Sequence, residues 1–106
     1  MLIAWTTVGT SAEAERLAAD VVAAGLAACV QIEGPIVSQF RWEGKTERVE
    51  EIRLCFKFLP EQRSALEKLV LAAYPYDTPE WLVVRAEHVG EKYLSWAKAT
   101  VHPPPL

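Results

Sequence analysis

A chain of 106 residues, 51% of them hydrophobic, is long enough to bury one compact core. Its formal charge of −3 argues against nucleic acid and membrane surfaces as partners, because Lys and Arg supply most of the affinity for polyanions. The longest apolar run, residues 21–30, is too short to cross a bilayer, and two cysteines are too few for a disulfide framework. We therefore expect a cytoplasmic protein with reduced thiols.

A strand followed by a helix is predicted at the start of the chain. Residues 2–8 form an apolar, Thr-containing run of strand length that ends at Gly9. Thr10 and Glu13 then have the spacing of a capping box, and apolar residues follow at helical intervals until Gly25. Glycine at that place is typical of a helix C-terminus.

A long hairpin is predicted next, with strands at residues 28–42 and 45–58 and a two-residue turn at Glu43-Gly44. The second strand alternates as expected for a sheet that is buried on one side. One face carries Ile52, Leu54, Phe56 and Phe58, and the other carries Arg53, Cys55 and Lys57.

The register of this hairpin requires one irregularity. Counting back from the turn without interruption places Val30 and Ile32 on the wrong face. A one-residue bulge at Gly34-Pro35 corrects this by pairing Ile32 with Leu54. Cys29 and Cys55 are not directly opposed in either register, so we expect no internal disulfide.

The remaining elements complete the order βαββαβ. Pro60 is expected in the first turn of a second helix, whose apolar stripe contains Leu66, Leu69, Val70 and Ala73. Residues 74–79 form a connector, residues 81–86 a fourth strand, and a short helix follows Gly90. This predicts an α+β, ferredoxin-like antiparallel sheet with helices on one face and an extra C-terminal helix. Residues 1–100 form one domain and residues 101–106 a Pro-rich tail.

The predicted hairpin is longer than the domain that carries it. A strand of about 14 residues spans about 46 Å, whereas a compact domain of this size is about 33 Å across. The protruding part retains Ile36, Val37, Phe40 and Trp42. Exposed apolar strand edges favour pairing with another chain, so we expect an oligomer. The alternative is a curled or floppy hairpin.

Four short motifs resemble those of the CutA (divalent-cation tolerance) family and occur in the family's order and spacing. They are residues 25–30 (Gly-Leu-Ala-Ala-Cys-Val), 41–45 (Arg-Trp-Glu-Gly-Lys), 75–80 (Pro-Tyr-Asp-Thr-Pro-Glu) and 93–96 (Tyr-Leu-Ser-Trp). The resemblance implies a homotrimer reminiscent of the PII signalling proteins, an association with tolerance of copper and other divalent cations, and no known catalytic reaction. The resemblance also implies that no cofactor is required, although Cu(II) or another divalent cation is a candidate ligand.

The candidate metal ligands are few. Family members usually carry His immediately before the Pro-Tyr pair, where this sequence has Tyr74, and a neutral phenol is a poor ligand for Cu(II). Cys29 and Cys55 are soft ligands suited to Cu(I), although a free cysteine in an apolar strand is more often a small buried hydrophobe. His88 and His102 lack the partner spacing of a zinc site.

A group of polar and aromatic residues is expected near the clefts between subunits: Arg41, Trp42, Lys57, Tyr76, Glu80, Tyr93 and Trp96. Their chemistry suits a small anion or polar ligand, with two cations for charge and aromatic rings for stacking. The alternative is that these aromatic residues only form the subunit interface, where Tyr and Trp are favoured.

Four functions are compared. The first is a non-enzymatic trimer that binds a metal ion or small ligand, and the second a passive trimeric scaffold. An acylphosphatase-type enzyme shares the βαββαβ order, but residues 8–11 offer no Arg for a phosphate loop, and no serine has a nucleophile elbow. An RNA-binding sheet would expose aromatic residues, whereas Phe56 and Phe58 are expected in the core.

Overall fold

The structure is a computed structural model that describes residues 1–74 and 77–101. Its elements follow the predicted order: β1 (Leu2–Val8), α1 (Ser11–Ala23), β2 (Cys29–Trp42), β3 (Lys45–Phe58), the 3-10 turn η1 (Pro60–Gln62), α2 (Arg63–Ala73), β4 (Leu82–Arg85) and α3 (Glu91–Val101). The four strands form one antiparallel sheet in the order β2-β3-β1-β4, which confirms the ferredoxin-like fold. The predicted tail lies outside the described residues from 102 onward.

Helix α1 begins and ends where its local signals place it. The Thr10 hydroxyl accepts a hydrogen bond from the Glu13 amide at 3.2 Å, as an N-cap should. The Glu13 carboxylate accepts from the Thr10 hydroxyl at 3.0 Å, rather than from the backbone amide that a full capping box would use. At the other end, the amides of Gly25 and Leu26 bond to the carbonyls of Val22 and Val21, the pattern of a Schellman motif.

The second helix differs from the prediction at its start and in the burial of Ala73. Pro60 starts the 3-10 turn η1, and the α-helix itself begins at Arg63. Leu66 and Val70 are buried and Leu69 is half-buried, as the predicted stripe requires, but Ala73 is exposed. Ala73 is the last residue of α2, where the helix ends and its stripe no longer faces the core.

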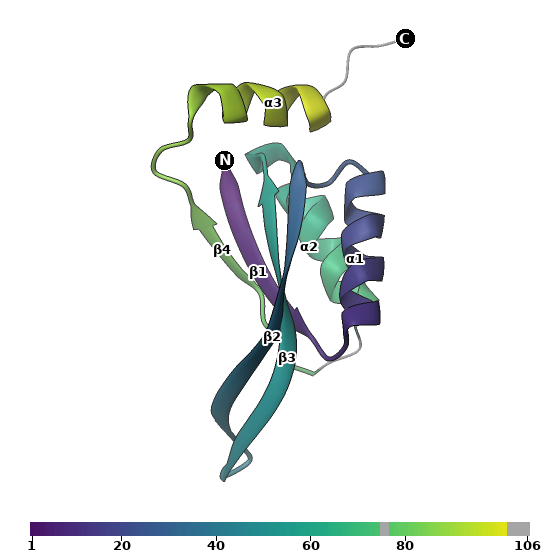
Figure 1. Ribbon diagram of the computed structural model, residues 1–106, viewed down its shortest axis with the longest axis vertical. Coiled ribbons are helices and arrows are strands. Elements are labelled where there is room, and N and C mark those ends of the chain that lie inside the picture. The colour runs from purple at the N-terminus through teal and green to yellow at the C-terminus, as the bar shows by residue number, and fades with distance from the viewer. Residues whose placement is uncertain (75–76, 102–106) are drawn as a thin grey trace.

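The core lies between the sheet and the two helices α1 and α2, which cover the same face (Figure 1). The buried face of β1 pairs with that of β3 through Leu2 with Phe58, Ala4 with Phe56, Thr6 with Leu54, and Val8 with Ile52. Phe56 and Phe58 are fully buried, as predicted. Burying such a side chain stabilises the fold by about 2 kcal/mol.

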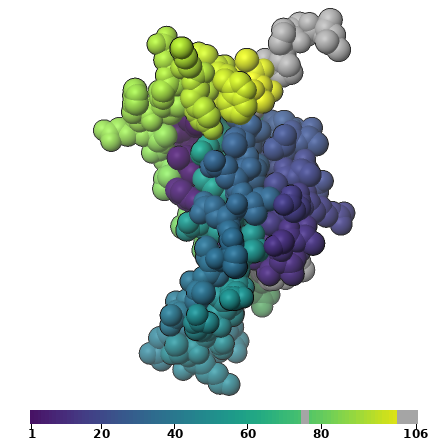
Figure 2. Space-filling model, viewed as in Figure 1, coloured from purple at the N-terminus to yellow at the C-terminus, as the bar shows by residue number. Residues whose placement is uncertain are grey.

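The hairpin of β2 and β3 protrudes from this body, and the molecule measures 52 × 28 × 22 Å (Figures 1 and 2). Its register shifts between Glu33 and Ile36, while Ile32 pairs with Leu54, which confirms the predicted bulge. A Cβ at Gly34 would lie 3.3 Å from the Ile52 Cα and 2.7 Å from its Cδ1. The bulge therefore brings the two backbones too close for any larger residue without repacking.

The opposite face of the sheet is not covered by α1 or α2, and we call it the open face. It carries Ile3, Trp5 and Thr7 of β1 beside Leu82 and Val84 of β4, with Leu82 57% and Val84 44% exposed. Helix α3 crosses one end of the sheet (Figure 1). There the Lys57 ammonium lies 5.8 Å from the centre of the Tyr93 ring.

Candidate functional site

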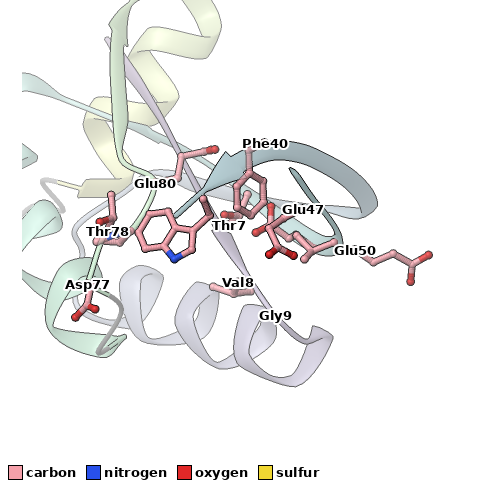
Figure 3. A pocket seen from close by; sticks show the side chains of 13 residues that line it. Thr7, Val8, Gly9, Phe40, Glu47, Glu50, Asp77, Thr78 and Glu80 are labelled. Atoms are coloured by element: carbon pink, nitrogen blue, oxygen red, sulfur yellow. The ribbon is translucent and has the colours of Figure 1, made fainter. Parts of the chain in front are cut away.

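A pocket of about 510 Å³ opens where the hairpin leaves the body of the molecule (Figure 3). We call it the hairpin pocket. Its walls come from three segments that are distant in the sequence: the end of β1, the hairpin, and the residues that precede β4. The lining residues are Thr7, Val8, Gly9, Phe40, Trp42, Glu47, Val49, Glu50, Glu51, Asp77, Thr78, Pro79 and Glu80.

The alternation of the hairpin aims most of its side chains into the pocket. Phe40 pairs with Glu47 and Ser38 with Val49, so these residues and Trp42 share one face of the ribbon. The bulge sets this parity, because one extra residue in β2 exchanges the faces of every residue beyond it.

Hydrogen bonds hold two walls of the pocket in place. The Thr6 hydroxyl donates to the Glu80 carbonyl at 2.7 Å and so ties the segment before β4 to β1. The Ser38 hydroxyl donates to the Glu51 carboxylate at 2.6 Å across the hairpin. Short bonds of this kind to a carboxylate are stronger than neutral ones, so Glu51 is held in a fixed position.

The pocket has a strongly negative lining. Five acidic residues contribute to it, and none of the described lining residues is Lys, Arg or His. They are Glu47, Glu50, Glu51, Asp77 and Glu80, of which Glu50 points its carboxylate away from the pocket (Figure 3). Phe40 and Trp42, which are 41% and 45% exposed, add aromatic surface. Carboxylates and aromatic faces both attract cations, so the lining favours a positively charged ligand over an anion. The described residues contain no group of three His, Cys, Asp or Glu arranged to hold a metal ion.

The structure divides the residues that the sequence suggested for a ligand site. Trp42 and Glu80 line the hairpin pocket, whereas Arg41 projects from the other face of the ribbon, where it pairs with Thr46. Lys57, Tyr93 and Trp96 lie together at the far end of the sheet. Tyr76 lies outside the described residues.

The group at α3 is a small aromatic cluster. The Tyr93 and Trp96 rings have centroids 5.5 Å apart, and Trp96 is 47% exposed. Lys57 adds a cation–π contact to Tyr93. This cluster covers an end of the open face, and it does not line the hairpin pocket.

The two candidate metal ligands lie apart. The Tyr74 side chain packs against the core, and its hydroxyl donates to the Glu13 carbonyl of α1 at 3.0 Å. Cys29 is the first residue of β2 and is half-buried, with its side chain on the open face. Tyr74 thus has a structural contact of its own.

Polar groups on the open face influence one another. Arg53 donates to Glu33 at 2.7 Å, and this contact raises the pKa of the guanidinium. Both side chains are about 40% exposed, so the pair adds little stability. Burial raises the pKa of the Cys55 thiol, while the nearby Lys57 ammonium acts in the opposite direction.

Four pocket carboxylates were not among the sequence candidates: Glu47, Glu50, Glu51 and Asp77. A signal for two of them was present, because alternation from the turn places Glu47 and Glu51 on the same face as Phe40 and Trp42. Asp77 stood in the motif of residues 75–80, but nothing in the sequence placed it near the hairpin, because that approach depends on long-range packing.

No helix in the described parts of the chain is long and apolar enough to cross a membrane. Taken together, the sheet order, the protruding hairpin and the acidic pocket define a ferredoxin-like α+β protein with a candidate ligand site at the base of its hairpin. A family model described as "CutA1 divalent ion tolerance protein" matches residues 2–100. The chain belongs to this family.

Individual relatives support this family assignment. The divalent-cation tolerance protein CutA of Yersinia pestis (strain Pestoides F) is 36% identical over 94% of this chain and 84% of its own length. The structure of CutA from Synechococcus elongatus PCC7942 superposes with a TM-score of 0.89 at 39% identity, covering 94% of this chain and 88% of that one. A second structure of that protein, complexed with a Bis-Tris molecule, gives a TM-score of 0.86 at 38% identity, covering 93% and 91%.

The periplasmic divalent cation tolerance protein CutA of Archaeoglobus fulgidus also matches, with a TM-score of 0.89 at 34% identity over 95% of this chain and 99% of that one. The names of these relatives describe a tolerance and specify no reaction.

Proposed function

We propose that the chain is a non-enzymatic, PII-like homotrimer that binds a small cation in the hairpin pocket. A protonated amine is favoured over a divalent metal ion such as Cu(II), because no group of three His, Cys, Asp or Glu among the described residues is arranged to hold a metal. The observation that carries the proposal is the lining of the pocket: acidic residues beside two exposed aromatic rings, with no basic residue among the described lining. The Bis-Tris molecule in the Synechococcus relative is a polyhydroxylated amine. When protonated it carries a positive charge, as the proposed ligand does.

The trimer is supported by apolar surface that a monomer leaves in water. Val37, Phe40 and Trp42 of the hairpin are exposed, and so are Leu82 and Val84 on the open face. The outer edges of β2 and β4 have no partner strand in the described sheet. A protruding hairpin that packs on the sheet of a neighbouring subunit covers both kinds of surface.

In such a trimer the hairpin pocket lies at the base of the intersubunit contact. A ligand bound there contacts both the body of its subunit and the hairpin that reaches the neighbour. Binding therefore stabilises the folded chain, and with it the assembly that the hairpin forms, through mass action. This supports a sensing or carrier role rather than catalysis, and the free thiols Cys29 and Cys55 are consistent with the cytoplasm.

Calorimetric titration with Cu(II) in one series and Bis-Tris in another tests the proposal and separates its two ligand classes. Replacing Trp42 by Ala or Glu80 by Gln removes a ring or a charge from the pocket, and we expect each to weaken binding by about tenfold, or ~1.4 kcal/mol. The matched control is Gln39→Ala, on the other face of the hairpin.

Arg41→Gln distinguishes a cation from an anion. A cationic ligand gains or keeps affinity when this positive charge is removed from the hairpin, whereas an anionic ligand loses affinity. A wild-type protein that binds neither Cu(II) nor Bis-Tris, or pocket variants that bind as the control does, would contradict the proposed function.

A further inference from the structure

Strand β3 presents alternate residues to the hairpin pocket, and their charges follow a fixed order. Glu47, Val49 and Glu51 lie on the pocket face, where all three are half-buried and line the pocket. Glu50 is exposed and directs its side chain away from the pocket (Figure 3). The pocket face of β3 is therefore acidic, then apolar, then acidic, at positions two residues apart.

Basic residues end this acidic stretch on both sides. Lys45, beside the turn, and Arg53, toward the body, share the same face by strand alternation, and neither lines the pocket. Arg53 donates to Glu33 from Nε at 3.3 Å and from Nη2 at 2.7 Å, which fixes its position. A cation between Glu47 and Glu51 is attracted, whereas a cationic group that extends past either carboxylate approaches a positive charge and is repelled.

The two carboxylates define a length. Glu51 follows Glu47 by four residues of uninterrupted strand, so their Cα atoms lie about 13 Å apart. The terminal nitrogens of an extended linear triamine, with one three-carbon and one four-carbon link, lie about 11 Å apart, from bond lengths of about 1.5 Å. Such a molecule reaches both carboxylates. A four-carbon diamine spans about 6 Å and reaches one, and a tetraamine spans about 16 Å and extends past them.

The surface between the two carboxylates suits the rest of such a molecule. Val49 offers apolar contact to methylene groups, and Phe40, opposite Glu47, offers an aromatic face to an ammonium group. The Ser38 hydroxyl holds Oε2 of Glu51. Its Oε1 accepts no hydrogen bond from the described residues and is available to a ligand. Glu51 is therefore oriented before the ligand binds, which lowers the entropic cost of binding.

We propose that the hairpin pocket selects linear aliphatic polyamines of triamine length, with terminal ammonium groups on Glu47 and Glu51 and the chain on Val49. This rests on the proposed function, because it specifies which cation the pocket binds. Lys45 and Arg53 set an upper limit to the length of the ligand. A surface that attracts cations only through its net negative charge has no such limit.

The test is calorimetric titration of the full chain with butylamine, 1,4-diaminobutane, spermidine and spermine in turn. We expect affinity to rise about tenfold from the diamine to spermidine, because only spermidine reaches both carboxylates. We expect no further rise for spermine, whose added charge lies beside a basic residue. Attraction by net charge alone gives an affinity that continues to rise through spermine.

Matched variants separate position from charge. Glu47→Gln and Glu51→Gln each remove one charge and keep an oxygen acceptor, and each should weaken spermidine binding about tenfold. Glu50→Gln removes the same charge from the other face of the strand and should leave the affinity unchanged. Lys45→Gln removes the limit at the turn and should raise the affinity for spermine relative to spermidine.

The outcomes also separate this proposal from the function on which it rests. Affinity that rises steadily through spermine, or equal losses in Glu50→Gln and Glu51→Gln, would overturn the selection by length. Cation binding itself stands in that case if wild type still binds Bis-Tris. A wild-type protein that binds none of these amines, Bis-Tris included, would overturn both proposals.

Discussion

Gln62 shows how one side chain joins two elements that are distant in the sequence. It is 7% exposed, and its amide nitrogen donates to the Gly25 carbonyl at 2.6 Å, just after α1. Its amide oxygen accepts from the Leu59 amide at 2.8 Å, just before η1. One buried polar group thus satisfies two backbone groups that no helix or strand pairs.

Replacing Gln62 by Ala should therefore lower the free energy of unfolding by about 2 kcal/mol, because two backbone groups lose their partner in a buried place. Urea denaturation measures this. The control is Gln39→Ala on the exposed hairpin face, which should change stability by less than about 0.5 kcal/mol. Equal stabilities for the two variants would show that water replaces the Gln62 contacts at no cost.

Tyr74 is a second residue whose contacts were not visible in the sequence. The family likeness placed it at a position of interest for metal binding, where a phenol replaces the usual imidazole. In the structure its hydroxyl donates to the Glu13 carbonyl and its ring packs against the core. The hydroxyl contact joins the end of α2 to α1, a tertiary relation that no local pattern encodes.

At the scale of elements, the hairpin follows from local rules. Its turn has φ of 49° at Glu43 and 77° at Gly44, the left-handed values of a type I′ turn. The sequence predicted a tight two-residue turn at this place without its type. The bulge was predicted because the hydrophobic face of β2 would otherwise point away from the core. Strand alternation and turn chemistry are local, so the sequence was sufficient for both.

The turn also offers a stabilising substitution. Glutamate at a left-handed position is strained, whereas asparagine tolerates it and Asn-Gly is the preferred pair for this turn. Glu43→Asn should raise the free energy of unfolding by about 0.5 to 1 kcal/mol. Thermal denaturation of the variant beside wild type measures this change. Glu43→Val is the matched control and should lower the stability, because a β-branched residue is disfavoured at a left-handed position. A Val variant as stable as the Asn variant would refute the turn assignment.

At the scale of the whole molecule, the pocket could be predicted only in part. Trp42 and Glu80 were named from motif and chemistry, and the hairpin face that carries Glu47 and Glu51 was accessible from alternation. Its remaining wall forms because Thr6 holds the Glu80 backbone against β1, a contact between residues 74 positions apart. Long-range contacts of this kind cannot be predicted from the sequence without the fold. The same holds for the separation of Lys57 from the pocket.

The protruding hairpin is also the feature on which the proposed assembly depends. Deleting residues 40–46 removes Phe40 and Trp42 from the tip and should convert the trimer to monomers, because the deleted part supplies the exposed apolar surface. Analytical ultracentrifugation reports the mass in solution, and circular dichroism checks that the body still folds. A folded deletion variant that sediments as a trimer would refute the role of the hairpin.

A native mass spectrum of the untagged protein, recorded while Bis-Tris and then Cu(II) are titrated in, tests the central claim most directly. The account predicts a species of three 11.8 kDa chains that takes up one cation per subunit in the hairpin pocket. A monomer at micromolar concentration, or a trimer that binds neither cation, would contradict it.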